Sequence, residues 1–228
     1  MPTEREKVIS MTTQELKAIF TDKSLSPQDR GEIGERAVTR LGVYWASQYK
    51  DHIWQSSYMY PQGPVHQTQN SMEAEPVTEI DLLIITPYRV FVIEIKTVYG
   101  IMKIDENSQI EISKTGEFTG DFEKKNYFQQ NEMHARHLYY HLAPVLPDGK
   151  PEYIIPLVVV AGNMRFEDHR PEHLIKAYPI VTATNLYQTL TELNQPLEYL
   201  LNINKIKTIL VEKRVLDKQR LLNSQTFK

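Results

Sequence analysis

The chain has 228 residues, of which 41% are hydrophobic and 24% charged, which is ordinary for a soluble globular protein with one substantial core. Its formal net charge of -3 excludes an overall basic field, so any nucleic-acid binding needs a local basic patch. The absence of cysteine excludes disulfides and thiolate zinc sites.

The N-terminal part is predicted to form two helices. The first covers residues 12–22, where Thr12 or Thr13 could act as the N-cap by accepting a hydrogen bond from a free amide. The second runs from about Pro27 to Tyr49, because proline suits the first turn of a helix. Apolar side chains recur every fourth residue along one face of this second helix, at Ile33, Ala37, Leu41 and Trp45.

The middle of the chain is predicted to be mostly extended, because it is rich in β-branched and aromatic residues. Strands are expected at residues 53–60, 78–86, 90–97, 101–104, 109–113 and 153–161. Between the first two strands, residues 61–76 contain three prolines and are expected to form a loop. Helices are expected at residues 122–142, 184–194 and 196–221. This order of elements predicts an α/β fold with a mixed central β-sheet flanked by helices.

No membrane contact is expected. No apolar run reaches the roughly 18–20 residues that a membrane-spanning helix needs. The first ten residues carry charges of both signs and no apolar core, unlike a signal peptide. These features favour a cytoplasmic protein.

Three charged residues interrupt the two most apolar strands. Asp81 lies within residues 78–86, and Glu94 and Lys96 lie within residues 90–97. Burying a carboxylate costs free energy unless another group pairs with it. The three charges are therefore expected to meet one another or a cation.

The short link between these two strands requires them to pair as an antiparallel hairpin. A two-residue loop places Asp81 opposite Glu94, and a four-residue loop places it opposite Lys96. Because Glu94 and Lys96 share one face of their strand, the three side chains lie close together in both registers.

Two carboxylates and an ammonium at this spacing have two interpretations. A hard divalent cation such as Mg²⁺ takes few protein ligands, mainly carboxylate oxygens, and a neighbouring lysine can orient water and offset charge on a phosphate. Alternatively, Lys96 could neutralise two partly buried acids in a structural ion-pair network.

The residues around this hairpin resemble a known family. Asp81, the apolar strand after it, and the sequence FVIEIK at residues 91–96 resemble the nuclease-related domain (NERD) family of the PD-(D/E)xK nuclease superfamily. The sequence GEIGE at residues 31–35 resembles the G-x-x-G-E helix motif of that family. Asn126 with Gln130 resembles its N-P-x-x-Q segment, with Tyr127 in place of the proline.

The resemblance implies a restriction-endonuclease-like core at residues 28–165. A helical extension at residues 1–27 would precede this core. A mostly helical region at residues 166–228 would complete the core or be appended to it.

The resemblance also implies a role for each matching residue. Asp81, Glu94 and the Ile95 carbonyl would ligate the metal, and Glu35 would bind a metal-bound water or a second ion. Lys96 would position the attacking water. Gln130 would support the site or touch the substrate backbone.

The activity that the resemblance implies is a nuclease that hydrolyses phosphodiester bonds with Mg²⁺, for which Mn²⁺ could substitute. DNA is the favoured substrate over RNA, and endonucleolytic cleavage is the favoured mode. The alternative is a catalytically inactive nucleic-acid-binding or scaffold module with the same fold. The sequence leaves open whether one or two metal ions bind.

Two further features could contact nucleic acid or a partner. His134, His137 and His141 share a helix face with Gln130, which suits a zinc site, a hydrated surface or a position near the substrate phosphate. Residues 203–228 carry seven Lys or Arg against two acids, as a phosphate-binding patch or the polar side of an amphipathic helix would. The C-terminal helices could also support a homo-oligomer or bind a partner protein.

Overall fold

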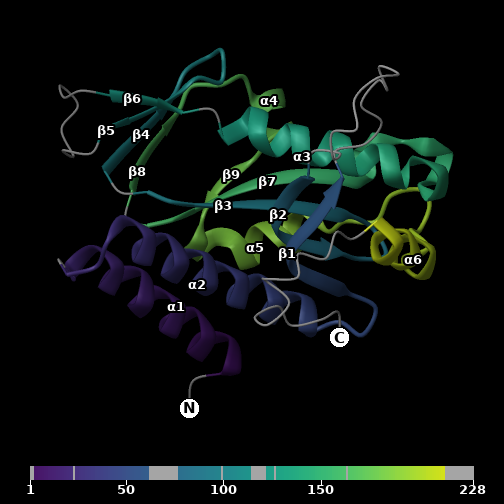
Figure 1. Cartoon of the computed structure of the whole chain (residues 1–228), viewed down its shortest axis with the longest axis horizontal. Helices are drawn as coiled ribbons and strands as arrows, with labels where there is room; N and C mark the ends of the chain where they lie inside the picture. Colours follow the sequence, from purple (N-terminus) through teal and green to yellow (C-terminus); the bar gives the residue numbers. More distant parts are fainter. Residues whose placement is uncertain are drawn as a thin grey trace, which may run out of the picture.

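The structure, a computed structural model of the chain, describes residues 3–22, 24–61, 77–98, 100–113, 122–125, 127–162 and 164–213. The elements in these ranges are α1 (Glu4–Thr21), α2 (Pro27–Ser47), β1 (Ile53–Pro61), β2 (Val77–Ile85), β3 (Val90–Thr97), β4 (Gly100–Ile104), β5 (Ile110–Ser113), β6 (Phe122–Lys125), α3 (Tyr127–Leu142), β7 (Ile154–Ala161), β8 (Met164–Asp168), α4 (Glu172–Ala177), β9 (Ile180–Thr182), α5 (Leu186–Leu193) and α6 (Ile203–Lys213). They form the predicted α/β fold, with helices on both faces of a mixed sheet (Figure 1).

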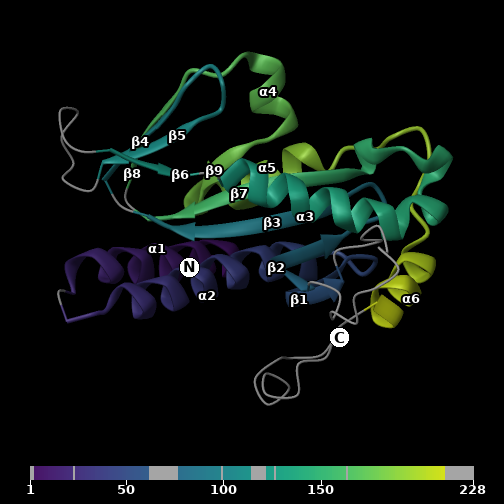
Figure 2. The ribbon, with the colours of Figure 1, turned by 45° about the horizontal axis from the view of Figure 1, so that its top comes forward.

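The central sheet has five strands in the order β1-β2-β3-β7-β9. β1, β2 and β3 pair antiparallel, whereas β3, β7 and β9 pair parallel. One apolar cluster joins the sheet to α1, α2 and α5, and a second joins its other face to α3 and α6. Figure 2 shows α1 and α2 on one side of the sheet and α3 on the other. Because the central strands are covered on both faces, they are apolar almost throughout.

A second sheet, of order β6-β5-β4-β8, continues from the first. Thr97 pairs with Ala161 at the end of β3 and β7, and Gly100 pairs with Met164 at the start of β4 and β8, in the same register. The parallel pair β3–β7 therefore resumes as β4–β8 after a short break. In Figure 1 this second sheet lies beside the central one, near α4.

The first helix begins earlier than predicted. α1 starts at Glu4, because the side chains of Thr3 and Glu6 cap its first turn reciprocally. Thr12 and Thr13, the predicted N-caps, lie in the interior of this helix. The prediction of Thr12 or Thr13 as the N-cap was wrong, because Thr3 and Glu6 form the capping pair at the start of the helix.

Two later helices begin later in the chain than predicted. Residues 122–125 form β6 and pair with β5, so α3 begins only at Tyr127. The helix predicted at residues 196–221 begins at Ile203, where the Asn202 side chain accepts a hydrogen bond from the Lys205 amide. Residues 62–76 of the predicted loop and residues 214–221 of this helix lie outside the described residues.

The described part of the C-terminal region is built into the core. β9 adds a strand to the central sheet. Leu186 and Leu190 of α5 are buried in one apolar cluster, and Ile206 and Leu210 of α6 in the other. None of the helices in the described ranges has both the length and the apolar character needed to cross a membrane.

Candidate active site

The two apolar strands that contain the charged residues, β2 and β3, pair in the register predicted for a two-residue loop. The amide of Thr86 donates to the carbonyl of Arg89 over 2.8 Å, which closes a two-residue turn. The ladder then runs as far as the pair of Leu82 with Ile93. The next position in this register sets Asp81 opposite Glu94, and the four-residue-loop alternative is excluded.

Asp81 lies where β2 stops pairing with β3. Its Oδ2 accepts a hydrogen bond from the Ile95 amide over 2.7 Å, so a carboxylate occupies the end of the ladder. On the other side of β2, the pairing with β1 skips Ser57 and Asp81 and then resumes. Ser57 has a φ of 48°, a left-handed conformation that costs a serine free energy.

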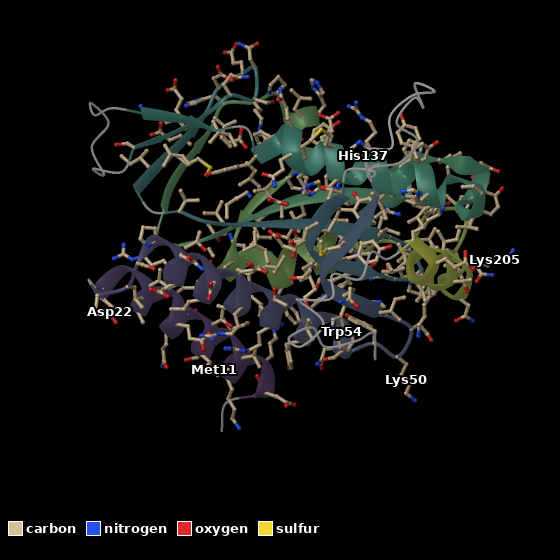
Figure 3. The ribbon with its side chains drawn as sticks, in the orientation of Figure 1. Met11, Asp22, Lys50, Trp54, His137 and Lys205 are labelled. Atoms are coloured by element: carbon tan, nitrogen blue, oxygen red, sulfur yellow. The ribbon has the colours of Figure 1, made fainter. Side chains whose placement is uncertain are left out.

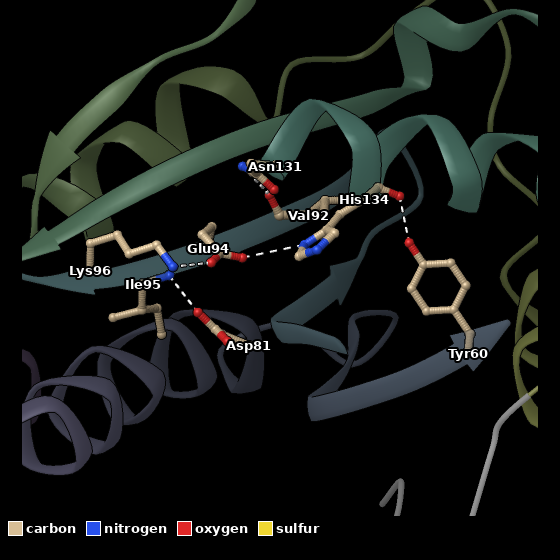
Figure 4. Close-up of polar contacts among 8 residues, drawn as sticks. All are labelled: Tyr60, Asp81, Val92, Glu94, Ile95, Lys96, Asn131 and His134. Atoms are coloured by element: carbon tan, nitrogen blue, oxygen red, sulfur yellow. Dashed lines mark hydrogen bonds and ion pairs between the residues drawn. The ribbon is translucent and has the colours of Figure 1, made fainter. Parts of the chain in front are cut away.

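This irregular position changes which face the strand presents. Leu82 packs in the cluster with α1, α2 and α5, whereas Ile80, two residues earlier, packs in the cluster with α3 and α6. A regular strand would keep both side chains on one face. The change of face at Asp81 turns its carboxylate toward the backbone of β3, as Figure 4 shows.

Glu94 lies between two cationic or potentially cationic groups (Figure 4). Its side chain is only 2% exposed, and its Oε1 forms an ion pair with Nζ of Lys96. Nδ1 of His134, from α3, lies 3.3 Å from Oε2. The Lys96 ammonium also lies 5.5 Å from the ring centroid of Tyr127, within cation–π range.

Burial and proximity move the pKa values of the two carboxyls apart. Burial, with the added effect of the charges of Glu94 and Glu35, raises the pKa of Asp81 to about 7. Burial also acts to raise the pKa of Glu94, but His134 and Lys96 outweigh it, so that pKa is lowered. Two acids held this close without a cation cannot both ionise easily.

Glu35 approaches the site from α2, and Gly34 makes this approach possible. A Cβ added at Gly34 would lie 2.0 Å from Oγ1 of Thr97 and 3.2 Å from Cβ of Ala161. The helix therefore crosses the ends of β3 and β7 at a distance that only glycine permits. A Cβ at Gly31, the other glycine of the motif, would meet nothing within 4 Å.

α3 brings Asn131 and His134 to the site. Nδ2 of Asn131 donates to the Val92 carbonyl over 3.2 Å, and the Tyr60 hydroxyl donates to the His134 carbonyl over 2.6 Å. Both side chains on α3 are buried. Gln130, the residue that the family motif indicated, is exposed on the same helix.

The family motif did not indicate Asn131, but the spacing of apolar residues along α3 predicts that its side chain faces the sheet. The buried apolar residues of α3 are Phe128, Ala135, Leu138 and Leu142. Asn131 and His134 lie three or four residues from members of this set, so they face the sheet with it. Asn126, the other motif residue, lies outside the described residues.

The three histidines of α3 do not gather around a common point. In the ranges that the structure describes, no three His, Asp or Glu side chains are placed to hold a metal ion together. His134 is buried beside Glu94, whereas His137 is half-buried, with its pKa lowered mainly by that burial. Figure 3 shows His137 on α3 and Lys205 on α6. The phosphate-binding patch that the sequence suggested at residues 203–228 stays a prediction.

The oxygen atoms of Asp81 and Glu94 nevertheless suit a hard divalent cation, because Mg²⁺ commonly takes only one or two carboxylates and keeps several waters. Oδ1 of Asn131 is buried and has no hydrogen-bond partner among the described residues, and Oε2 of Glu94 has only the 3.3 Å approach of Nδ1 of His134, which is not aligned as a hydrogen bond. Buried polar atoms left in this way often mark an ion or a water molecule. The raised pKa of Asp81 agrees, since a bound cation would favour its ionised form.

Comparison with known proteins gives a family and no individual relative. The sequence profile of the nuclease-related domain matches residues 30–161, which is more than half of the chain. No curated protein and no solved structure matches the chain. The matched range contains Glu35, Asp81, Glu94 and Lys96.

Proposed function

The chain belongs to the nuclease-related domain family and has a restriction-endonuclease-like core, and on this basis we propose that it is a divalent-metal-dependent nuclease that hydrolyses phosphodiester bonds. The observation that carries the proposal is the position of Asp81 beside Glu94 and Lys96. The carboxyl of Asp81 is held at the end of the β2–β3 ladder, and its pKa is raised to about 7. Strongly shifted acids of this kind are concentrated at functional sites.

Asp81 and Glu94 would hold the cation, with the Ile95 carbonyl as a further oxygen and Glu35 nearby. When bound, Mg²⁺ or Mn²⁺ would supply positive charge that activates water and stabilises the phosphate in the transition state.

Lys96 has the groups needed to serve the attacking water. Its ammonium pairs with Glu94, and its side chain is 23% exposed, so it can reach toward a substrate phosphate. In that position it would donate hydrogen bonds to the water or to a phosphate oxygen and offset developing negative charge. Tyr127, on whose ring face the ammonium lies, would limit how far Lys96 can move.

The test is a cleavage assay with Mg²⁺ or Mn²⁺ on supercoiled plasmid DNA. Wild-type protein should nick or linearise the plasmid, and Asp81→Ala and Lys96→Ala should each lower the rate by about 100-fold or more. Lys50→Ala, which removes an exposed ammonium between α2 and β1, should cleave as the wild type does. Equal residual activity in all four proteins would mean that the activity comes from a contaminant and that the proposal is wrong.

DNA is the proposed substrate, and the same assay on single-stranded RNA of matched length would compare the two. The net charge of -3 means that binding should depend on local basic groups and weaken steeply with salt. Cleavage of a closed circle would further indicate an endonuclease, because a circle offers no free end.

One observation favours a second candidate, a module that binds nucleic acid without cleaving it. No three-ligand metal cluster occurs among the described residues, and Lys96 already neutralises part of the charge on Glu94. If this candidate is correct, calorimetry will show no binding of Mn²⁺ at millimolar concentration. Nucleic acid would still bind in the absence of a divalent cation.

A further inference from the structure

Both carboxylate oxygens of Glu94 lie beside a nitrogen atom, and the two groups that carry these nitrogens differ in mobility. Lys96 contacts Oε1 from the same strand, through a long side chain that is 23% exposed. His134 lies 3.3 Å from Oε2, comes from α3, and is almost fully buried. A partly exposed lysine can rotate away, whereas a buried imidazole has no space to do so. Oε1 is therefore the oxygen that can exchange its partner.

The backbone of α3 around His134 is fixed to two strands of the sheet. The Tyr60 hydroxyl on β1 donates to the His134 carbonyl over 2.6 Å, and Tyr60 is itself fully buried. One turn earlier in α3, Nδ2 of Asn131 donates to the Val92 carbonyl over 3.2 Å. Because Val92 lies two residues before Glu94 on β3, this bond sets the height of α3 above the carboxylate.

We propose that His134 is a positioning residue that fixes the orientation of the Glu94 carboxylate for a divalent cation, an inference that rests on the proposed function. Nδ1 would keep Oε2 in place, and Oε1 would be the oxygen that leaves Lys96 to hold the cation. Carboxylates that bind metals are usually held by a further hydrogen-bonding group, and loss of that group lowers metal affinity or activity by about 10- to 100-fold.

Three substitutions at one position separate this role from simple packing. In His134→Asn the amide nitrogen can occupy the place of Nδ1, whereas in His134→Gln it reaches the place of Nε2. His134→Leu fills the space without a donor. His137→Leu, one turn further along α3, is the matched control for loss of a histidine from this helix.

The measurement is Mn²⁺ affinity by isothermal titration calorimetry on the full chain, with thermal melting to confirm that each variant folds. His134→Leu and His134→Gln should bind Mn²⁺ about 10- to 100-fold more weakly than the wild type, and their cleavage should recover as Mn²⁺ is raised. His134→Asn and His137→Leu should bind it nearly as well as the wild type. If His134→Leu does not fold, the comparison of Asn with Gln decides alone.

Three results would overturn the inference, and they differ in what they mean for the proposed function. Wild-type affinity in all folded His134 variants, or equal losses in His134→Asn and His134→Gln, would show that the Nδ1 contact does not position Glu94 and would leave the proposed function standing. Failure of the wild-type protein to bind Mn²⁺ at all would remove the proposed function and this inference with it.

Discussion

The amide of Ile95 donates a hydrogen bond to Oδ2 of Asp81 over 2.7 Å, at the point where the β2–β3 ladder ends. The bond holds an acid in place without supplying a full opposite charge. Burial, together with the charges of Glu94 and Glu35, raises the pKa of Asp81 to about 7, so its ionised form destabilises the folded chain. Free-energy costs of this kind are concentrated at functional sites.

Asp81→Asn should therefore stabilise the metal-free protein at pH 8. The pKa in the folded chain, about 7, lies above the ordinary value of 3.8, so the folded state keeps a proton that the unfolded state loses between these pH values. The contribution of the Asp81 carboxyl to the free energy of unfolding therefore falls as the pH rises from about 4 to about 7. An asparagine does not titrate, so the variant does not lose this stability. We expect a gain on the order of 2–4 kcal/mol at pH 8 and little change at pH 4 in urea unfolding.

The pH series supplies its own control, because all other titrating groups are shared by the two proteins. A stability difference that stays the same from pH 4 to pH 8 would show that the carboxyl of Asp81 is not destabilising in the folded chain.

Gly34→Ala should move α2 away from the strands that it crosses. The new Cβ would lie 2.0 Å from Oγ1 of Thr97, so either the helix or the threonine must shift. Overpacking of this kind costs about 1–3 kcal/mol in unfolding free energy, and displacement of the neighbouring Glu35 should also weaken Mn²⁺ binding.

Gly31→Ala is the matched control, because it lies in the same helix and its Cβ would meet nothing within 4 Å. It should be neutral or stabilise the protein by about 0.5–1 kcal/mol, through the better helix propensity of alanine. Equal losses in the two variants would contradict the close approach at Gly34.

Lys96→Met should separate metal binding from catalysis. The ammonium pairs with Oε1 of Glu94, so a cation bound at this oxygen would have to displace it. Removing this competing charge should leave Mn²⁺ affinity at least as high as in the wild type, while cleavage is lost. Calorimetry measures the Mn²⁺ affinity of Lys96→Met, with Lys205→Met as the control. Weaker Mn²⁺ binding by Lys96→Met than by this control would mean that Lys96 supports the cation instead of competing with it.

Arg170→Leu should destabilise the junction between the second sheet and α3. The buried guanidinium bonds to both oxygens of Asp168 and to the Tyr178 carbonyl, and it lies 4.3 Å from the ring centroid of Phe128. Breaking a buried ion pair by removing one partner costs about 3–5 kcal/mol.

For comparison, Lys176→Met breaks the exposed ion pair between Lys176 and Glu172 on α4, and it should leave the urea midpoint unchanged. A small loss for Arg170→Leu, similar to that of Lys176→Met, would show that the buried network contributes little to stability.

Register arithmetic makes the hairpin predictable from the sequence. A short link between two apolar strands allows few pairings, and each of them places Asp81 beside Glu94 and Lys96. The interruption of the β1–β2 pairing at Ser57 could not be predicted. No local sequence pattern indicates a positive φ at a serine, and this conformation depends on how both faces of β1 and β2 pack. The four residues of β6 are predicted to be helical but form a strand, since their short polar sequence gains extended structure only by pairing with β5.

The contact of His134 with Glu94 depends on tertiary placement. The spacing of the histidines indicates one helix face but not which histidine lies over β3. The Asn131 bond to Val92 and the Tyr60 bond to the His134 carbonyl fix that choice, and each joins residues far apart in the sequence.

Anomalous diffraction from a crystal soaked in Mn²⁺ tests the proposed metal site most directly. We predict a peak in contact with the carboxylates of Asp81 and Glu94, with the Lys96 ammonium displaced from Oε1. A map with no peak there, and with Lys96 still paired to Glu94 at saturating Mn²⁺, would contradict this prediction.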